Sequence, residues 1–122
     1  MPHKRNSFVR FWAVLAVLMA LAIAVGSLMP AQELPEQMPW DKLQHLTGYG
    51  MLALLTCLAG VTRLNTLMMV FVYGVAIEYA QTLAPGRMGG DWADILANTL
   101  GALLGIIIAT VIVAVYLTMR RR

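Results

Sequence analysis

Hydrophobic residues form four long runs along the chain, and short polar segments separate them. The runs cover residues 8–29, 43–61, 66–83 and 92–118. A helix of about 20 apolar residues spans the hydrocarbon core of a bilayer. The pattern therefore predicts an all-α integral membrane protein, a bundle of four transmembrane helices.

The segments between the runs have the composition of turns and loops. Three prolines block helix propagation between the first and second runs: Pro30, Pro35 and Pro39. A short turn at residues 62–65 precedes the third run, and a glycine-rich loop at residues 84–91 precedes the fourth. Asp41 suits the N-terminus of the second helix, where a carboxylate meets the positive end of the dipole.

The first run has two interpretations. It follows Lys4, Arg5 and Arg10, and a basic start before an apolar stretch is also typical of a secretory signal peptide. This stretch exceeds the usual apolar core of about 7 to 15 residues. We therefore favour an uncleaved helix, which the topology of the remaining chain also requires.

Composition supports a single membrane unit over residues 1–122. Of the residues, 60% are hydrophobic and only 12% are charged, and the mean hydropathy is +0.72. Soluble domains are nearer half apolar and a quarter charged. The single cysteine, Cys57, excludes an intramolecular disulfide and is interpreted as a small buried residue.

The net charge of +3 is interpreted as a signal of orientation and not of nucleic-acid binding. With the N-terminus inside, seven basic residues face the cytoplasm: Lys4, Arg5, Arg10, Arg63, Arg120, Arg121 and Arg122. Only Lys42 and Arg87 then face outward. Two pairs of aromatic residues also fall near the interfaces: Trp12 with Tyr116 inside, and Trp40 with Trp92 outside. Both chain ends are therefore expected in the cytoplasm.

Polar residues form one stripe at the outer end of each of the last three helices. In the second helix the stripe is Asp41, His45 and Tyr49, and in the third it is Glu78 and Gln81. In the fourth helix it is Asp91, Asp94, Asn98, Gly101 and Gly105. A charged side chain deep in hydrocarbon costs about 2.5 to 3.5 kcal/mol, so such residues normally face the protein interior and have partners. We therefore expect Glu78, Asp94 and His45 to converge.

Two further features lie near this constellation. The GxxxG step at Gly101 and Gly105 would let a neighbouring helix approach closely. The outer loop contains glycines, which permit positive φ, and Arg87, which could hold a phosphate or carboxylate bidentately.

Each of these features also has a structural interpretation. Asp41 could be only a helix cap, and Lys42 and Arg87 only headgroup anchors. GxxxG is usually plain packing, His45 could be a satisfied core histidine, and Glu78 could form a structural salt bridge with Arg87. Glu78 and Asp94 have fewer structural explanations, because they are acids a turn or more inside the membrane.

Taken in order, the motifs resemble the VanZ-like family. They read DKxxHxxxY from Asp41, ExxQ from Glu78, PGR at residues 85–87, and DxxDxxxNxxGxxxG from Asp91. The resemblance covers about residues 41–105, whereas the first helix and both tails carry no signature. It implies a small polytopic protein of the bacterial inner membrane. The family takes its name from a member linked to low-level teicoplanin resistance, a role that the resemblance does not carry over to this chain.

The favoured hypothesis is an outward-facing site for an anionic lipid headgroup or a lipid-linked envelope precursor. Lys42 and Arg87 would hold the anion, His45 would transfer a proton, and Glu78 or Asp94 would tune that histidine or act as base. Five further residues are expected to line the site: Asp41, Tyr49, Gln81, Asp91 and Asn98. A variant adds a divalent metal held by His45, Glu78, Asp91 and Asp94, although no recognised metal motif is present.

Two alternatives come from other functional classes. Proton or ion transport would use the buried acids as relays, but the inner halves of the helices are almost purely apolar, so a route would need a homo-oligomer. An accessory subunit would use the polar groups only to lock the helices together. Neither a serine hydrolase arrangement nor a phosphate-binding GxxxxGK[ST] motif is evident, and whether a reaction occurs stays open.

Overall fold

The computed structural model describes residues 2–33 and 41–122, with side chains described from Asn6 onward. The helices in this part of the chain are α1 (Pro2–Leu28), the short 3-10 helix η1 (Ala31–Glu33), α2 (Asp41–Leu58), α3 (Arg63–Gln81) and α4 (Trp92–Arg120). The described residues contain no strand. The expected all-α fold is therefore confirmed.

The helix bounds differ from the hydrophobic runs by a few residues, because polar residues can occupy a first or last turn. The helix α1 begins before the run, at Pro2, and α2 begins at Asp41, which lies in the first helical turn and not before it. Residues 34–40 lie outside the described part of the chain, and with them Pro35 and Pro39 of the expected first connection and Trp40, expected at the outer interface. So do the side chains of Lys4 and Arg5.

The turn between α2 and α3 has the predicted length but lies three residues earlier, at residues 59–62 instead of 62–65. Gly60 adopts a positive φ of 91°, and the amides of Gly60 and Val61 donate to the carbonyls of Cys57 and Thr56. This glycine-terminated arrangement ends α2. Thr62 then caps α3 by accepting a hydrogen bond from the Asn65 amide, so Arg63 and Asn65 belong to the helix and not to the turn.

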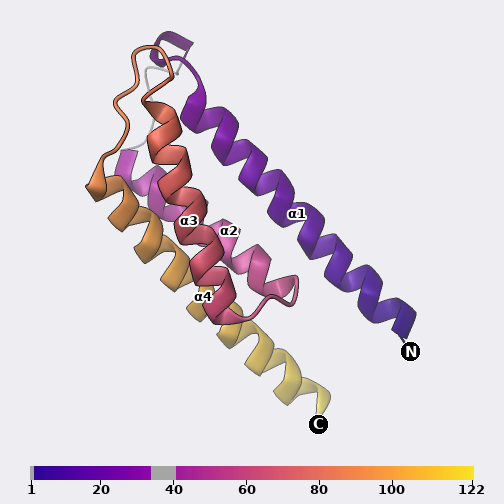
Figure 1. Ribbon diagram of the computed structural model, residues 1–122. Helices are drawn as coiled ribbons and strands as arrows, with labels where there is room; N and C mark the ends of the chain where they lie inside the picture. Colours follow the sequence, from indigo (N-terminus) through magenta and orange to yellow (C-terminus); the bar gives the residue numbers. More distant parts are fainter. Residues whose placement is uncertain (1, 34–40) are drawn as a thin grey trace.

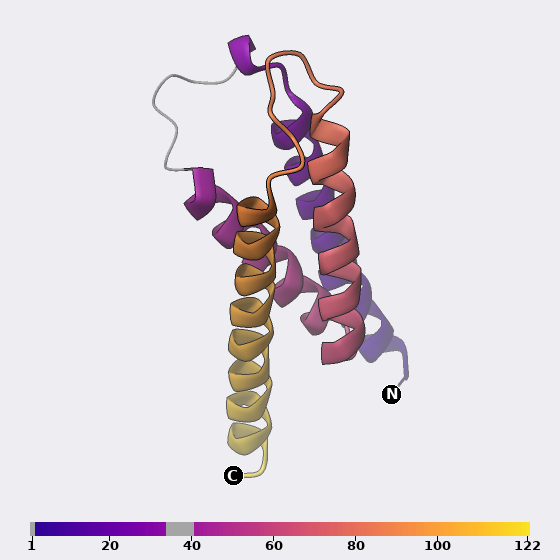
Figure 2. The same cartoon turned by 60° about the vertical axis from the view of Figure 1, so that its left-hand side comes forward.

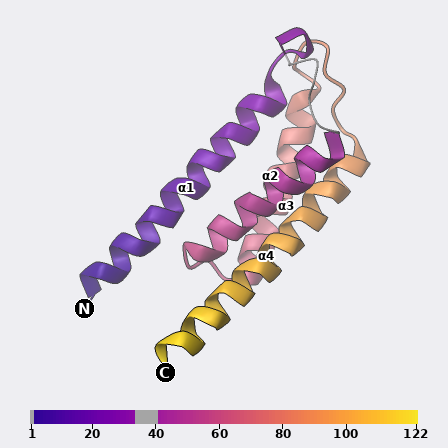
Figure 3. The same cartoon turned by 180° about the vertical axis from the view of Figure 1, so that it is seen from behind.

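The four helices run alternately up and down (Figure 1). Both termini lie at one end of the bundle, which we call the terminal end, while η1 and the loop at residues 82–91 lie at the other, the loop end (Figures 1 and 2). The helix α2 lies between α1 and α4 (Figure 3), and α1 does not contact α4 within the described residues. As a result α2 and α4 are parallel, and both begin at the loop end.

Two of the helices are long and apolar enough to cross a membrane: α1 from Asn6 to Leu28, and α4. The helices α2 and α3 do not reach the same hydropathy, because polar residues occupy the loop end of each. The apolar residues of α4 are largely exposed over its last three turns, where Val111, Val115 and Tyr116 are each more than half exposed. These features indicate association with a membrane.

The contact between α2 and α4 is the most extensive in the bundle, and glycines make it possible. A Cβ at Gly101 would collide with the Leu46 carbonyl oxygen, and one at Gly105 with the carbonyl oxygen of Gly50. The two backbones therefore touch along this seam, as the GxxxG step predicted. A small core continues below it, formed by Tyr49, Leu52, Ala53, Val70, Ala102 and Ile106.

The helix α1 is joined to α3 by two polar contacts. The Tyr73 hydroxyl donates to the carbonyl of Ala20, and Gln81 Nε2 donates to the carbonyl of Ser27 at 3.0 Å. Between these helices an apolar cavity of about 780 Å³ opens over α2, lined by small and aliphatic residues such as Ala16 and Ala76. It lies away from the polar residues of the loop end.

Candidate functional site

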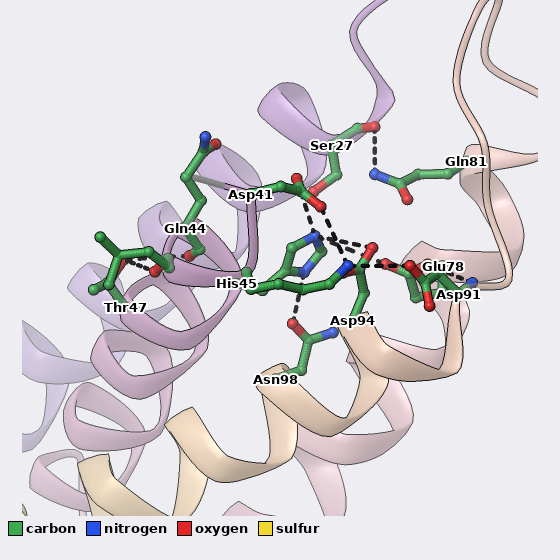
Figure 4. Close-up of polar contacts among 12 residues, drawn as sticks. Ser27, Asp41, Gln44, His45, Thr47, Glu78, Gln81, Asp91, Asp94 and Asn98 are labelled. Carbon is green, nitrogen blue, oxygen red and sulfur yellow. Dashed lines mark hydrogen bonds and ion pairs between the residues drawn. The ribbon is translucent and has the colours of Figure 1, made fainter. Parts of the chain in front are cut away.

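Polar side chains from α2, α3 and α4, together with one from the loop before α4, gather at the loop end of the bundle, and all but one of them are ionisable (Figure 4). We call this group the polar cluster; its members are Asp41, Lys42, His45, Glu78, Asp91, Asp94 and Asn98. The spacing along each helix explains the gathering, because residues three or four apart share a helix face. Four of the seven are buried: His45, Glu78, Asp94 and Asn98.

His45 lies at the centre of the polar cluster. Its Nε2 atom is 3.6 Å from Asp94 Oδ2, 3.7 Å from Asp41 Oδ1 and 4.0 Å from Glu78 Oε1. The three residues for which the sequence predicted convergence, His45, Glu78 and Asp94, therefore lie together.

The opposite side of the imidazole is fixed by α4. His45 Nδ1 lies 2.7 Å from Asn98 Oδ1, and since an amide oxygen only accepts, the ring donates from Nδ1. Tyr49, one turn below, stacks on the imidazole with ring centroids 6.2 Å apart. The ring is thus held in one orientation, with Nε2 directed at the carboxylates.

Lys42 bridges the acids on the exposed side of the polar cluster. Its Nζ atom donates to Asp94 Oδ1 and, at 3.0 Å, to Asp91 Oδ2, and it lies 3.7 Å from Asp41 Oδ2. Asp41 and Asp94 therefore direct one oxygen toward Lys42 and the other toward His45.

Glu78 is fully buried, and the loop before α4 closes over it. The Gly90 amide donates to the Glu78 carbonyl oxygen at 3.0 Å, and the Asp91 amide donates to Glu78 Oε2 at 3.2 Å. This approach requires glycine, because a Cβ at Gly89 would collide with the Glu78 carbonyl and the Thr82 amide, and Gly90 has a φ of +75°. The other carboxylate oxygen, Oε1, has no hydrogen-bond partner among the described residues.

Asp91 caps α4 and connects the loop to the polar cluster. Its Oδ1 accepts from the Ala93 amide at 2.8 Å. That hydrogen bond, followed by the one from Lys42, holds the pKa of the Asp91 carboxyl below its usual value, because both stabilise the ionised form. Asp91 is therefore a carboxylate at neutral pH.

Two predicted site residues lie apart from the polar cluster. Gln81 points toward α1 and binds the Ser27 carbonyl (Figure 4). Arg87 is half-buried on the loop, three residues before Gly90, and its side chain forms no ion pair with the described acids. The suggested salt bridge between Glu78 and Arg87 is thus absent from the described residues.

Two glycines that support the polar cluster were missed by the sequence analysis. Gly50 supplies the α2 half of the seam. A Cβ at Gly74 would lie only 3.0 Å from Asn98 Nδ2 and 3.2 Å from the Tyr49 ring, so its absence makes room for both side chains. The position of Gly74, four residues before Glu78 on the same face, was the available signal.

Three ligand atoms of the polar cluster lie within 4.8 Å of one another, one each from Asp41, His45 and Asp94, and could hold a metal ion. Two residues that the sequence grouped with the metal candidates, Glu78 and Asp91, lie outside this set. Asp91 turns its oxygens to the Ala93 amide and Lys42, and Glu78 Oε1 lies 4.0 Å from His45 Nε2.

The sequence of residues 4–114 matches the VanZ/LLP1 family. The chain belongs to this family. The match is wider than the motif region at residues 41–105, since it includes nearly all of α1 and most of α4. The VanZ/LLP1 assignment therefore covers every helix of the bundle, although the recognisable motifs lie on α2, α3, α4 and the loop before α4.

For this VanZ/LLP1 protein, comparison with curated proteins and with solved structures finds no match. The cluster provides an oriented imidazole, a buried acid with one unpaired oxygen, and a lysine shared among three carboxylates.

Proposed function

We propose that this VanZ/LLP1 protein crosses the bacterial inner membrane four times and binds the headgroup of an anionic lipid or lipid-linked envelope precursor at an outward-facing polar cluster. The observation that carries the proposal is the convergence of ionisable side chains from three helices at one end of a bundle with apolar outer faces. Such residues inside a membrane protein generally mark a functional site.

The four-span arrangement is supported by the packing of the helices. The 18 residues of α2 extend about 27 Å at 1.5 Å per residue, close to the roughly 30 Å of the hydrocarbon core. Because α2 is parallel to α4 and in backbone contact with it, the two occupy the same depth. Exposed apolar side chains on α3, among them Met68, Met69 and Val72, suit contact with lipid.

Orientation follows from the distribution of basic residues. Arg10 is near the start of α1, Arg63 begins α3, and the chain ends in three arginines, so all of these belong to the terminal end. Lys42 and Arg87 belong to the loop end. Basic residues concentrate on the cytoplasmic side, which puts both termini in the cytoplasm and the polar cluster outside.

The polar cluster then lies at the depth of lipid headgroups. Arg87 is the residue best suited to hold a phosphate, because it lies on the loop over Glu78 and forms no ion pair with the described acids. Lys42 is shared among carboxylates and would have to exchange one of them for the ligand. In a processing step, His45 would transfer a proton and Glu78 or Asp94 would act as base.

Transport through the bundle has less support. Below the polar cluster the described core is apolar and includes Leu52, Val70 and Ile106. The buried hydroxyls of Thr56 and Thr66 lie toward the terminal end, beyond that core. Between the two, the described core offers the hydroxyls of Tyr49 and Tyr73, and the Tyr73 hydroxyl is already bonded to the Ala20 carbonyl, so a proton or ion would lack a continuous polar path.

Lipid binding can be tested with the purified protein in nanodiscs or detergent. We expect native mass spectrometry to show preferential retention of phosphatidylglycerol over phosphatidylcholine. The variant Arg87→Gln should lower that preference at least severalfold. Arg63→Gln, at the terminal end, is the matched control and should behave like the parent. Equal retention of both lipids, or equal loss in the two variants, would contradict the proposal.

A further inference from the structure

We infer that Asp41, His45, Glu78 and Asp94 form a binding site for a divalent transition-metal ion such as Zn²⁺ or Mn²⁺. The inference concerns the same polar cluster, and it rests on the proposed function only in giving the metal a role in holding a phosphate. Metal binding itself requires no lipid.

The imidazole of His45 is oriented as in a metal ligand. Because Nδ1 donates to Asn98, the Nε2 atom is the free ligand position, and it faces one oxygen each from Asp41, Glu78 and Asp94. A histidine that binds metal typically donates its other ring N–H to an oxygen in this way.

The distances from His45 Nε2 to the nearby carboxylate oxygens also favour an ion over hydrogen bonds. The three oxygens lie 3.6, 3.7 and 4.0 Å from Nε2, beyond the 2.7 to 3.2 Å of an N–H···O hydrogen bond. An N–H group at Nε2 would therefore lie too far from all three oxygens to donate a hydrogen bond to any of them. Ligands about 2.0 to 2.2 Å from a tetrahedral zinc ion are roughly 3.4 Å from one another. The ligand atoms of Asp41, His45 and Asp94 lie within 4.8 Å of one another, so a contraction would bring them to such an ion. Glu78 lies outside that set, with Oε1 4.0 Å from His45 Nε2, and would move in as the fourth ligand.

Glu78 contributes a buried oxygen that has no hydrogen-bond partner in the described part of the chain. This side chain is 0% exposed, yet Oε1 has no hydrogen-bond partner among the described residues while Oε2 receives the Asp91 amide. A buried carboxylate oxygen without a partner is costly. It is directed at His45 Nε2, where the ion would satisfy it.

The oxygens not offered to the ion are held by a second set of contacts. Lys42 donates to Asp94 Oδ1 and lies 3.7 Å from Asp41 Oδ2. The Asp91 amide holds Glu78 Oε2. Such outer contacts orient metal ligands. Asp41, with 58% of its side chain exposed, also leaves a path by which the ion can arrive from solvent.

Charge and ligand type define the class of ion. The polar cluster has four carboxylates, Asp41, Glu78, Asp91 and Asp94, against one lysine, so its centre attracts a cation, whereas Arg87 on the loop stays available to an anion. One imidazole with carboxylates suits Zn²⁺ or Mn²⁺ better than Mg²⁺, which prefers oxygen ligands alone. A bound ion would reverse the local charge and present a Lewis acid to a phosphate.

The test is metal titration of the full-length protein in detergent, without added lipid, after removal of metal with a chelator. We expect calorimetry with Zn²⁺ or Mn²⁺ to give one site per chain, and metal analysis after gel filtration to agree. Co²⁺ should give visible ligand-field bands of low coordination number. His45→Ala should lose at least about 100-fold in affinity, and Asn98→Ala, which removes only the outer contact, about 10- to 100-fold.

Asp41→Asn changes an exposed side chain, so we expect this variant to fold even if substitutions of buried residues prevent folding. It should weaken metal binding at least tenfold. Glu33→Gln, an acid in η1 outside the polar cluster, is the matched control and should bind like the parent. Absence of binding to the parent by both ions, or equal binding by the parent and Asp41→Asn, would overturn the inference. Metal binding without preference for phosphatidylglycerol would contradict only the headgroup proposal. Preference for phosphatidylglycerol without metal binding would contradict only the metal site.

Discussion

At the scale of single residues, each acid of the polar cluster divides its two oxygens between different partners. Asp94 and Asp41 each direct one oxygen toward Lys42 and the other toward His45, and Glu78 divides its oxygens between the Asp91 amide and His45. The exposed lysine and the buried histidine therefore act on the same carboxylates. A change in charge at one of them alters the electrostatic environment of the other.

Replacing Glu78 with glutamine tests whether groups within the protein stabilise the buried carboxylate in the absence of metal. Without metal we expect Glu78→Gln to raise the free energy of unfolding by about 1 to 3 kcal/mol, because a neutral amide of the same shape removes an unpaired buried oxygen charge. With saturating Zn²⁺ the order should reverse, since the parent gains a ligand contact that the variant lacks. Thermal unfolding in detergent with and without Zn²⁺ measures both.

Loss of stability in both conditions would show that the Glu78 charge is satisfied within the protein itself. The Glu33→Gln variant, at an exposed acid in η1, should change neither value and controls for the loss of one negative charge.

Sequence reasoning predicted which residues converge but not how they pair. His45, Glu78 and Asp94 were identifiable because hydrocarbon penalises isolated charges. The partners were not, because they depend on the relative heights of the helices. Lys42, expected to hold an anion, is paired with acids, and Gln81, three residues from Glu78, points toward α1 instead.

At the scale of helices, the seam between α2 and α4 positions the polar cluster. We expect Gly105→Ala to lower the free energy of unfolding by about 1 to 3 kcal/mol, because the added methyl group collides with the Gly50 carbonyl and the helices must separate. The control is Gly26→Ala in α1, where an added Cβ meets nothing within 4 Å. It should be neutral or should stabilise by up to about 1 kcal/mol. Chemical or thermal unfolding of both variants measures the difference.

The loop that covers Glu78 also depends on one glycine. In Gly89→Ala the new methyl group would displace the loop from the last turns of α3. We expect the Gly90 and Asp91 amides, which donate to Glu78, to exchange with deuterium at least tenfold faster than in the parent, as measured by NMR. Gly48→Ala, where a Cβ would meet only the side chains of Ile23 and Met19 at 3.7 Å or more, should leave these rates unchanged.

The sequence predicted one half of the seam. The spacing of Gly101 and Gly105 on the face of Asp94 and Asn98 was sufficient for α4. Gly50 was missed because a single glycine in an apolar run has no partner four residues away to indicate a contact face. Its role is visible only once α4 is placed against α2.

At the scale of the whole molecule, the proposed topology can be mapped with single cysteines introduced after Cys57→Ala. Met88, 92% exposed on the loop, and Met119, 72% exposed near the end of α4, mark the two ends of the bundle. A membrane-impermeant maleimide should label Met88→Cys in intact spheroplasts and Met119→Cys only after permeabilisation. The reverse pattern, or equal labelling of both, would exclude the orientation that we propose.

The backbone contact between α2 and α4 also makes the geometry of the polar cluster sensitive to chain length. Since no side chain separates Gly50 from Gly101, the seam cannot absorb a register error by changing a rotamer. One residue inserted between His45 and Gly50 would turn the imidazole by about 100° and shift it by about 1.5 Å along the axis. The histidine would then leave Asn98 and face α1 or the surroundings, so the length of this helical segment is as strict a requirement as the identity of its residues.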